Sequence, residues 1–269
     1  MKNQIETKLL VAQIEEILKE VTKSKTTILN RAELIQDKPM HVVWIDFIVR
    51  FTSHLNVIGI VLDEATVESL HAVEHSLGIL LRACLFDCIT VSETIVHMDE
   101  IDGYSSKEKQ EEVYLAANTD QLKFLITRME SIKKKGIKLN SNVNLDKVVE
   151  NVLVNYDNFF SDAKNRKFKF DKQKNMLNTI VTIMASERFQ EDATEMLELW
   201  EHYSRYEHYG PLSAELLNMP IRENWNRMIS VLMYTTHCIS YIFACFQIKP
   251  TVSFLDLKIH ELQQIKMTR

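Results

Sequence analysis

Polar side chains that could bind a ligand or move a proton are densest between His202 and Pro211, in the sequence HYSRYEHYGP. The segment lies at the end of an expected helix, where helical spacing puts Ser204 beside His208 and His202 beside Tyr206. The alternative is that this segment is an ordinary amphipathic helix C-terminus that binds no ligand and has no catalytic role. The catalytic candidates are His202, His208 and Arg205, and the candidate ligand contacts here are Ser204, Tyr206 and Glu207.

Two charges stand alone on an apolar stretch. Arg82 and Asp87 are the only charged residues between Glu74 and Glu93. Each needs a partner or a polar cavity, because an unpaired buried charge is costly. Five residues of helix turn through about 140°, so the two side chains can reach different neighbours. We predict a polar cleft where both face residues 202–208 and Arg82 contacts an anion; a structural ion pair between helices is the alternative.

One stretch is distinctly basic and contains aromatic residues. Proteins bind single-stranded nucleic acids with cations that contact phosphates and with rings that stack on bases. The stretch is therefore a candidate nucleic-acid patch, and a solvated loop between helices is the alternative, because charge runs are common on surfaces. The patch consists of Lys164, Arg166, Lys167, Phe168, Lys169 and Phe170.

Sharper catalytic or metal-binding signatures are absent from the sequence. It contains no glycine-rich phosphate loop, zinc-protease motif, hydrolase serine motif or calcium loop. Its four cysteines lack CxxC or CxxH spacing and lie in segments that read as buried helix. We therefore expect no metal and no cofactor, and thiols kept reduced in a cytoplasmic setting. The N-terminus has neither an apolar signal core nor a cleavage site, which agrees with that expectation.

The elements that must position these residues are helices. The chain has 269 residues but only 5 Gly and 4 Pro, too few for the turns of a sheet protein of this length. Apolar residues instead recur at helical spacing. The expected helices cover about 3–23, 26–36, 40–62, 64–100, 105–132, 145–160, 172–186, 190–209, 222–247 and 254–266.

The fold class follows from the strongest of these helices. The stretch 64–100 has apolar residues on several faces, so other helices should surround it. We predict an all-α, multi-helix bundle around this long central helix. A single domain, 1–269, is the simplest organisation, with a weaker subdivision near 136–144, where Gly136 and an asparagine-rich link follow three lysines.

Charge and hydropathy narrow the choice of partners. A net charge of −5 gives no global attraction to nucleic acid or an anionic membrane. Residues 228–246 are nearly uncharged and long enough to span a membrane, but their tyrosine, threonine, histidine and serine content favours a buried core helix, so we expect no membrane partner. A homo-oligomer could form through the helix at 254–266, whose apolar stripe is Leu255, Ile259 and Leu262.

Two segments resemble uncharacterised bacterial proteins of the HEPN-like helical group: LLRACLFD at 80–87 and SRYEHYG at 204–210. The resemblance implies nucleotide binding or RNA cleavage in toxin or phage-defence systems, with Arg82, Asp87, Ser204 and His208 as site residues. Catalytic ribonucleases of that group have four to six residues between an arginine and a histidine. In this chain Arg50 and His54 have three residues between them, and Arg205 and His208 have two.

Three functions remain open from the sequence. The first is binding of an anionic ligand, a nucleotide or RNA, in the polar cleft. The second is metal-independent RNA cleavage, with His208 or His202 as general base and Arg82 or Arg205 stabilising the phosphoryl charge. The third is a non-catalytic scaffold that associates with itself. Whether the protein is an enzyme is undecided at this stage.

Overall fold

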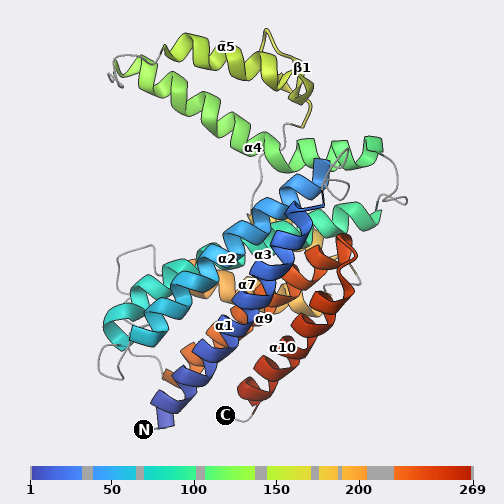
Figure 1. Ribbon diagram of the computed structural model, residues 1–269. Helices are drawn as coiled ribbons and strands as arrows, with labels where there is room; N and C mark the ends of the chain where they lie inside the picture. Colours follow the sequence, from blue (N-terminus) through green and yellow to red (C-terminus); the bar gives the residue numbers. More distant parts are fainter. Residues whose placement is uncertain are drawn as a thin grey trace. The chain divides into compact units, whose positions relative to one another are not determined.

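A computed structural model describes residues 2–31, 39–64, 70–100, 107–136, 144–170, 176–186, 190–204 and 221–267 (Figure 1). These residues are almost entirely helical, which confirms the all-α multi-helix class. The helices are α1 (Lys2–Leu29), α2 (Pro39–Glu64), α3 (Leu70–Glu100), α4 (Lys107–Lys134), α5 (Leu145–Asn155), α6 (Met176–Met184), α7 (Gln190–Ser204), α9 (Ile221–Cys245) and α10 (Lys249–Met267).

The chain forms two compact units. Unit 1 contains residues 1–96 and 177–269, and unit 2 contains residues 97–176. Unit 2 is therefore an insertion between the two halves of unit 1. The division does not fall near 136–144, because that stretch connects α4 and α5, which pack against each other inside unit 2.

Unit 1 is a helical bundle. In it α1 packs against α2 and α10, and α9 packs against α10 and α2 (Figure 1). α1 is continuous, so the break expected near residue 24 is not present; Ser24 is buried and its hydroxyl lies 2.6 Å from that of Thr251. α3 buries residues on most of its faces between Cys84 and Ser92, as the sequence predicted for a surrounded helix.

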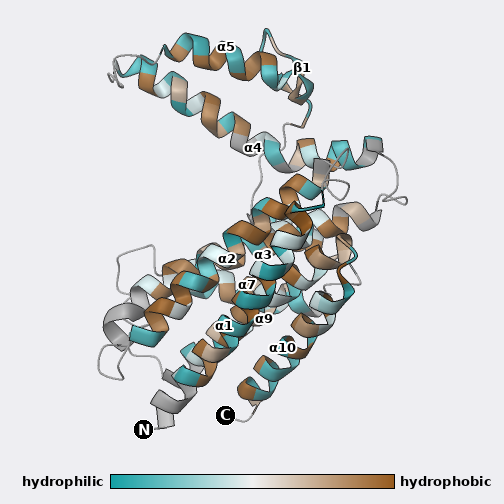
Figure 2. Ribbon diagram, in the orientation of Figure 1, coloured by the Kyte–Doolittle hydropathy of each residue, from teal (hydrophilic) through white to brown (hydrophobic). Residues whose placement is uncertain are grey.

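Two helices are long and apolar enough to cross a membrane by length and composition alone, counting only the part of the chain that the structure describes. They are Met40–Glu64 and Asn224–Cys245. In the most apolar 18-residue stretch of each, 39% of the first and 72% of the second is buried. The second is α9, which packs as a core helix of the bundle. Figure 2 shows that α2 is largely hydrophobic, and Val42, Val49 and Ile60 are among its exposed residues.

The apolar stripe of α10 lies inside unit 1. Leu255 and Leu262 have no solvent exposure, and Ile259 is half-buried. The stripe that suggested self-association is thus already covered by helices of the same chain. Helical spacing was read correctly here, but the sequence did not reveal which surface would cover the stripe.

Unit 2 combines two helices with a short β-hairpin. Strands β1 (Phe160–Asp162) and β2 (Lys167–Phe168) pair antiparallel, after a 3₁₀ turn, η2 (Asp157–Phe159). The helix expected at 145–160 therefore ends at Asn155. The reason is a small core that the turn and hairpin complete, made of Leu115, Leu122, Ile126, Phe159 and Phe160.

Candidate functional site

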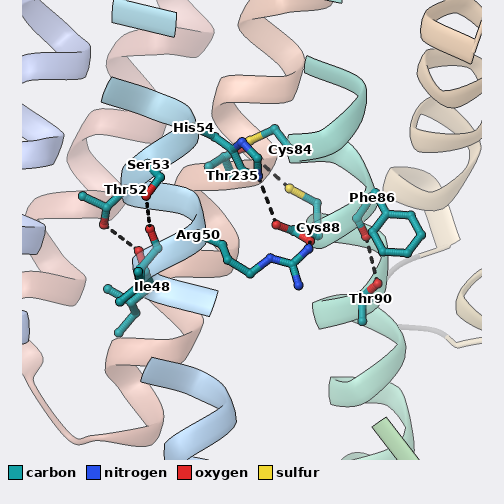
Figure 3. A network of polar contacts seen from close by, with 12 residues as sticks. Ile48, Arg50, Thr52, Ser53, His54, Cys84, Phe86, Cys88, Thr90 and Thr235 are labelled. Atoms are coloured by element: carbon teal, nitrogen blue, oxygen red, sulfur yellow. Dashed lines mark hydrogen bonds and ion pairs between the residues drawn. The ribbon is translucent and has the colours of Figure 1, made fainter. Parts of the chain in front are cut away.

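A carboxylate lies buried at the contact between α2 and α3. Asp87 has no solvent exposure, and both of its oxygens meet side chains of α2. Arg50 donates from Nη2 to Oδ1, and His54 Nε2 lies 3.3 Å from Oδ2. Arg50 and His54 are one helical turn apart, so α2 presents both toward the same point of α3 (Figure 3). We call these three residues the Asp87 cluster.

The donors of the Asp87 cluster reach the surface although the acceptor does not. The side chain of Arg50 is 44% exposed and that of His54 is 21% exposed, against 0% for Asp87. A guanidinium carries five N–H donors, and the bond to Asp87 leaves others facing solvent. A molecule that approaches from solvent therefore meets N–H groups rather than the carboxylate.

Neutral thiols lie on the inner side of the cluster. Cys84 Sγ is 2.9 Å from Thr235 Oγ1 on α9, and Cys88 Sγ is 3.6 Å from the same oxygen (Figure 3). Hydrogen bonding to Cys88, together with burial, raises the pKa of Cys84, and burial raises the pKa of Cys88. Both thiols stay protonated and act as packing groups. In the described ranges, no group of three or more His, Cys, Asp and Glu is arranged to hold a metal ion.

Arg82 leaves α3 on the flank that faces α7. Its Nε donates to Ser204 Oγ at 3.3 Å, and its guanidinium carbon lies 4.4 Å from the centre of the Trp200 ring. Trp200 in turn contacts Phe86, with ring centres 6.1 Å apart. The structure thus brings Arg82 and Ser204 together, as the sequence analysis expected.

Asp87 does not share that neighbour. It contacts Arg50 and His54 on α2, so the expectation that Arg82 and Asp87 face the same segment is wrong for Asp87. The physical reason is the rotation of about 140° between helix positions five residues apart, which directs the two charges to different neighbouring helices.

His202, a catalytic candidate, is buried. It is 6% exposed, and its ring packs against that of Tyr203 with ring centres 4.9 Å apart. In the part of the chain that the structure describes, this imidazole is almost closed to solvent. The remaining candidates of the segment, Arg205, Tyr206, Glu207 and His208, lie outside the described residues.

Arg50 and His54 were not among the site residues predicted from the sequence, where they stood out only for the number of residues between them. The signal that identifies them is their position on α2. They stand one turn apart on a helix rich in apolar residues, and a buried aspartate on a neighbouring helix requires such partners.

The basic stretch forms the hairpin of unit 2 and the residues after it. The ring of Phe168 lies 4.6 Å from that of Phe160, and both Phe168 and Phe170 pack against the core of unit 2. Lys164, Lys167 and Lys169 are exposed. The rings that suggested base stacking are therefore partly buried against this core, while the lysines face solvent.

Comparison with protein-family models, curated proteins and solved structures finds no match to this chain. The HEPN-like resemblance accordingly rests on the two sequence segments alone.

Proposed function

We propose that the chain binds an anionic, phosphate-bearing ligand, a nucleotide or an RNA end, at the Asp87 cluster. One observation carries the proposal: a carboxylate without solvent exposure holds an arginine and a histidine whose own side chains are open to solvent. Burying a carboxylate costs several kcal/mol that its partners must offset. The arrangement keeps two donors in fixed positions at the surface.

The chemistry of these donors suits phosphate. A planar guanidinium matches the spacing of phosphate oxygens and binds them through paired N–H groups. Arg50 and Asp87 cancel in charge, so a protonated His54 gives the cluster a net charge of +1. In that protonated form, the nitrogen of His54 that faces away from Asp87 is a further donor.

Arg82 is the second cationic contact that we assign to an extended ligand. It lies less than a turn and a half before Asp87 on α3, on the flank that faces α7 rather than α2. Its guanidinium lies over the Trp200 ring and is bonded to Ser204, which fixes its direction. A mononucleotide needs only the Asp87 cluster, whereas an RNA strand would also use Arg82.

Calorimetric titration with ADP and with inorganic pyrophosphate tests this proposal. Arg50→Lys keeps a positive charge beside Asp87 and removes the paired donors, so the fold should survive while binding weakens by about tenfold or more. Arg31→Lys, at an exposed position of unit 1, is the matched control and should bind like the unaltered chain. Equal affinity of the two variants for both ligands would exclude the site.

A second candidate function, RNA cleavage, is favoured by the contact between His54 and Asp87. A carboxylate bonded to one imidazole nitrogen orients the ring and leaves the other nitrogen to accept a proton. His54 would take the proton of a ribose 2′-hydroxyl; the 2′-oxygen then attacks phosphorus and the bond to the 5′-oxygen breaks. The 5′-oxygen takes a proton from water, and the hydroxide left behind takes the proton that His54 holds. Arg50 would stabilise the charge on the phosphoryl oxygens.

Incubating the chain with labelled RNA separates cleavage from binding alone. Cleavage predicts fragments ending in a 2′,3′-cyclic phosphate, and their loss in a His54→Ala variant. Intact RNA with the unaltered chain, or undiminished cutting by His54→Ala, excludes this second function and leaves ligand binding to be judged by calorimetry.

A further inference from the structure

Positive charge is concentrated in unit 2 after residue 120. Residues 121–176 contain 13 Lys and Arg against 6 Asp and Glu, a net charge of +7 in a chain whose net charge is −5. The rest of the chain therefore carries −12. Segregation of charge on this scale creates a local field that attracts polyanions, even though the whole protein is acidic.

The hairpin turn holds the centre of this charge in a defined shape. Asp162 accepts hydrogen bonds from the backbone N–H and the side-chain amide of Asn165, at 3.1 and 2.6 Å. Arg166 adopts a left-handed conformation with φ 54° and forms an ion pair with Glu130. Hydrogen bonding to the Asn165 side chain lowers the pKa of Asp162, whose oxygens are occupied within the turn.

Along β2 and the two residues after it, exposed lysines alternate with partly buried phenylalanines. Lys167 and Lys169 are exposed, whereas Phe168 and Phe170 pack on the core of unit 2. This is the period-two pattern of a strand with one buried face. Lys164 is exposed in the turn, and across the residues described these three lysines have no ion-pair partner. They present three exposed cations within six residues of the chain.

We propose that Lys164, Lys167 and Lys169 form a docking surface for the phosphate backbone of nucleic acid. Nucleic acid matches it because the strand carries regularly repeated charge and is bound by lysines without base-specific contacts. Phe168 and Phe170 are partly buried against the core of unit 2, so the contacts that we assign are those of the lysines with phosphate, and this surface does not discriminate between sequences. The packing of the same rings on the core of unit 2 also argues against a lipid-binding surface, which would insert apolar side chains into the membrane beside its lysines.

This inference concerns unit 2 and does not depend on the Asp87 cluster of unit 1. A backbone contact releases bound counterions, so the affinity falls steeply with salt. Three lysine contacts contribute about 2 to the slope of log affinity against log salt for a single strand, and about 3 for a duplex.

The test measures fluorescence anisotropy of a labelled strand of about 20 nucleotides, single and as a duplex, over a series of salt concentrations. The triple variant of the hairpin changes each of its three lysines to glutamine. The matched control removes the same charge from exposed lysines of unit 1. The variants are Lys164→Gln, Lys167→Gln and Lys169→Gln, and the control is Lys8→Gln, Lys19→Gln and Lys249→Gln.

The hairpin variant should keep the helical circular dichroism of the unaltered chain. It should bind strands of different sequence more weakly, by the same factor for each. The slope of log affinity against log salt should become shallower by about 2 to 3. The control should keep the original slope. An unchanged slope in the hairpin variant, an equal loss in the control, or binding to phosphatidylserine vesicles in place of the strands would overturn the proposal. An Arg50→Lys variant that loses ADP yet keeps the strand would show that the two sites are separate.

Discussion

The guanidinium of Arg50 donates to the carboxylate of Asp87, 37 residues away in sequence and without solvent exposure. This contact joins α2 to α3 and fixes the direction of a side chain that is itself 44% exposed. Stability therefore depends mainly on the buried carboxylate of Asp87, and the proposed binding depends mainly on the exposed guanidinium of Arg50. Changes at Asp87 should act first on folding, and conservative changes at Arg50 should act first on the ligand.

Asp87→Asn should destabilise unit 1 by about 2 to 3 kcal/mol. The amide has nearly the same shape, but it cannot accept charge-assisted bonds of the same strength from Arg50 and His54, and its own NH₂ group points a donor at one of them. Urea unfolding followed by circular dichroism measures the change. Asp63→Asn, at an exposed position of α2, is the control and should stay within about 0.5 kcal/mol. Equal midpoints for the two variants would contradict a structural role for the buried carboxylate.

Leu255→Ala should cost about 2 to 5 kcal/mol, because the side chain is fully buried and its removal leaves a cavity among packed helices. Leu257→Ala, two residues along the same helix at 53% exposure, should cost less than about 0.5 kcal/mol. Thermal unfolding of both variants gives the comparison. A similar loss of stability at the two positions would mean that α10 does not pack against the other helices of unit 1 through the face that carries Leu255.

Helix positions could be predicted from the sequence because burial of one face imposes a period of 3.6 residues, which α3 and α9 follow over many turns. The buried charges of α3 could be recognised for the same reason, since Arg82 and Asp87 interrupt an apolar stretch. Their partners could not be assigned, because helical periodicity gives rotation about one axis and contains no information on which helix packs there.

The hairpin of unit 2 escaped prediction for a different reason. Its lysine and phenylalanine residues alternate over only a few positions, from Lys167 to Phe170, which is too short to distinguish a strand from a basic loop. The same alternation suggested a stacking surface when the rings were taken as exposed. Their partial burial depends on a core formed by α4 and the residues Phe159 and Phe160, which no local pattern specifies.

Native thiol titration should detect at most one of the four cysteines. Cys84, Cys88 and Cys238 are buried, and the pKa values of Cys84 and Cys88 are raised, so these groups are neither accessible nor ionised near neutral pH. Cys245 is partly exposed. An Ellman assay with and without denaturant checks this, and all four should react after unfolding. Rapid reaction of two or more thiols in the folded chain would contradict the packing between α3 and α9.

Acid should weaken unit 1 through Glu195, which links α7 to α9 and α10. Its carboxylate accepts from Ser230 Oγ and Lys266 Nζ, each at 2.7 Å, and from the Tyr234 hydroxyl at 2.6 Å. Burial alone would raise the pKa of Glu195, but the hydrogen bonds from Lys266, Tyr234 and Ser230 hold it below its ordinary value. Folding thus favours the ionised form over the protonated one.

The sign of the pH dependence follows from that depressed pKa. Glu195 contributes its full stabilisation above the pKa of an unfolded glutamate, about 4.3, and loses it as the pH falls through the lower folded value. The melting temperature should therefore fall below about pH 4.3 less steeply in Glu195→Gln than in the unaltered chain, and Glu195→Gln should already be less stable at pH 7. Glu198→Gln, an exposed neighbour on α7, is the control for the other carboxylates and should follow the unaltered curve. If the Glu195 and Glu198 variants show the same dependence of melting temperature on pH, the ion pair between Lys266 and Glu195 does not stabilise the packing of α10.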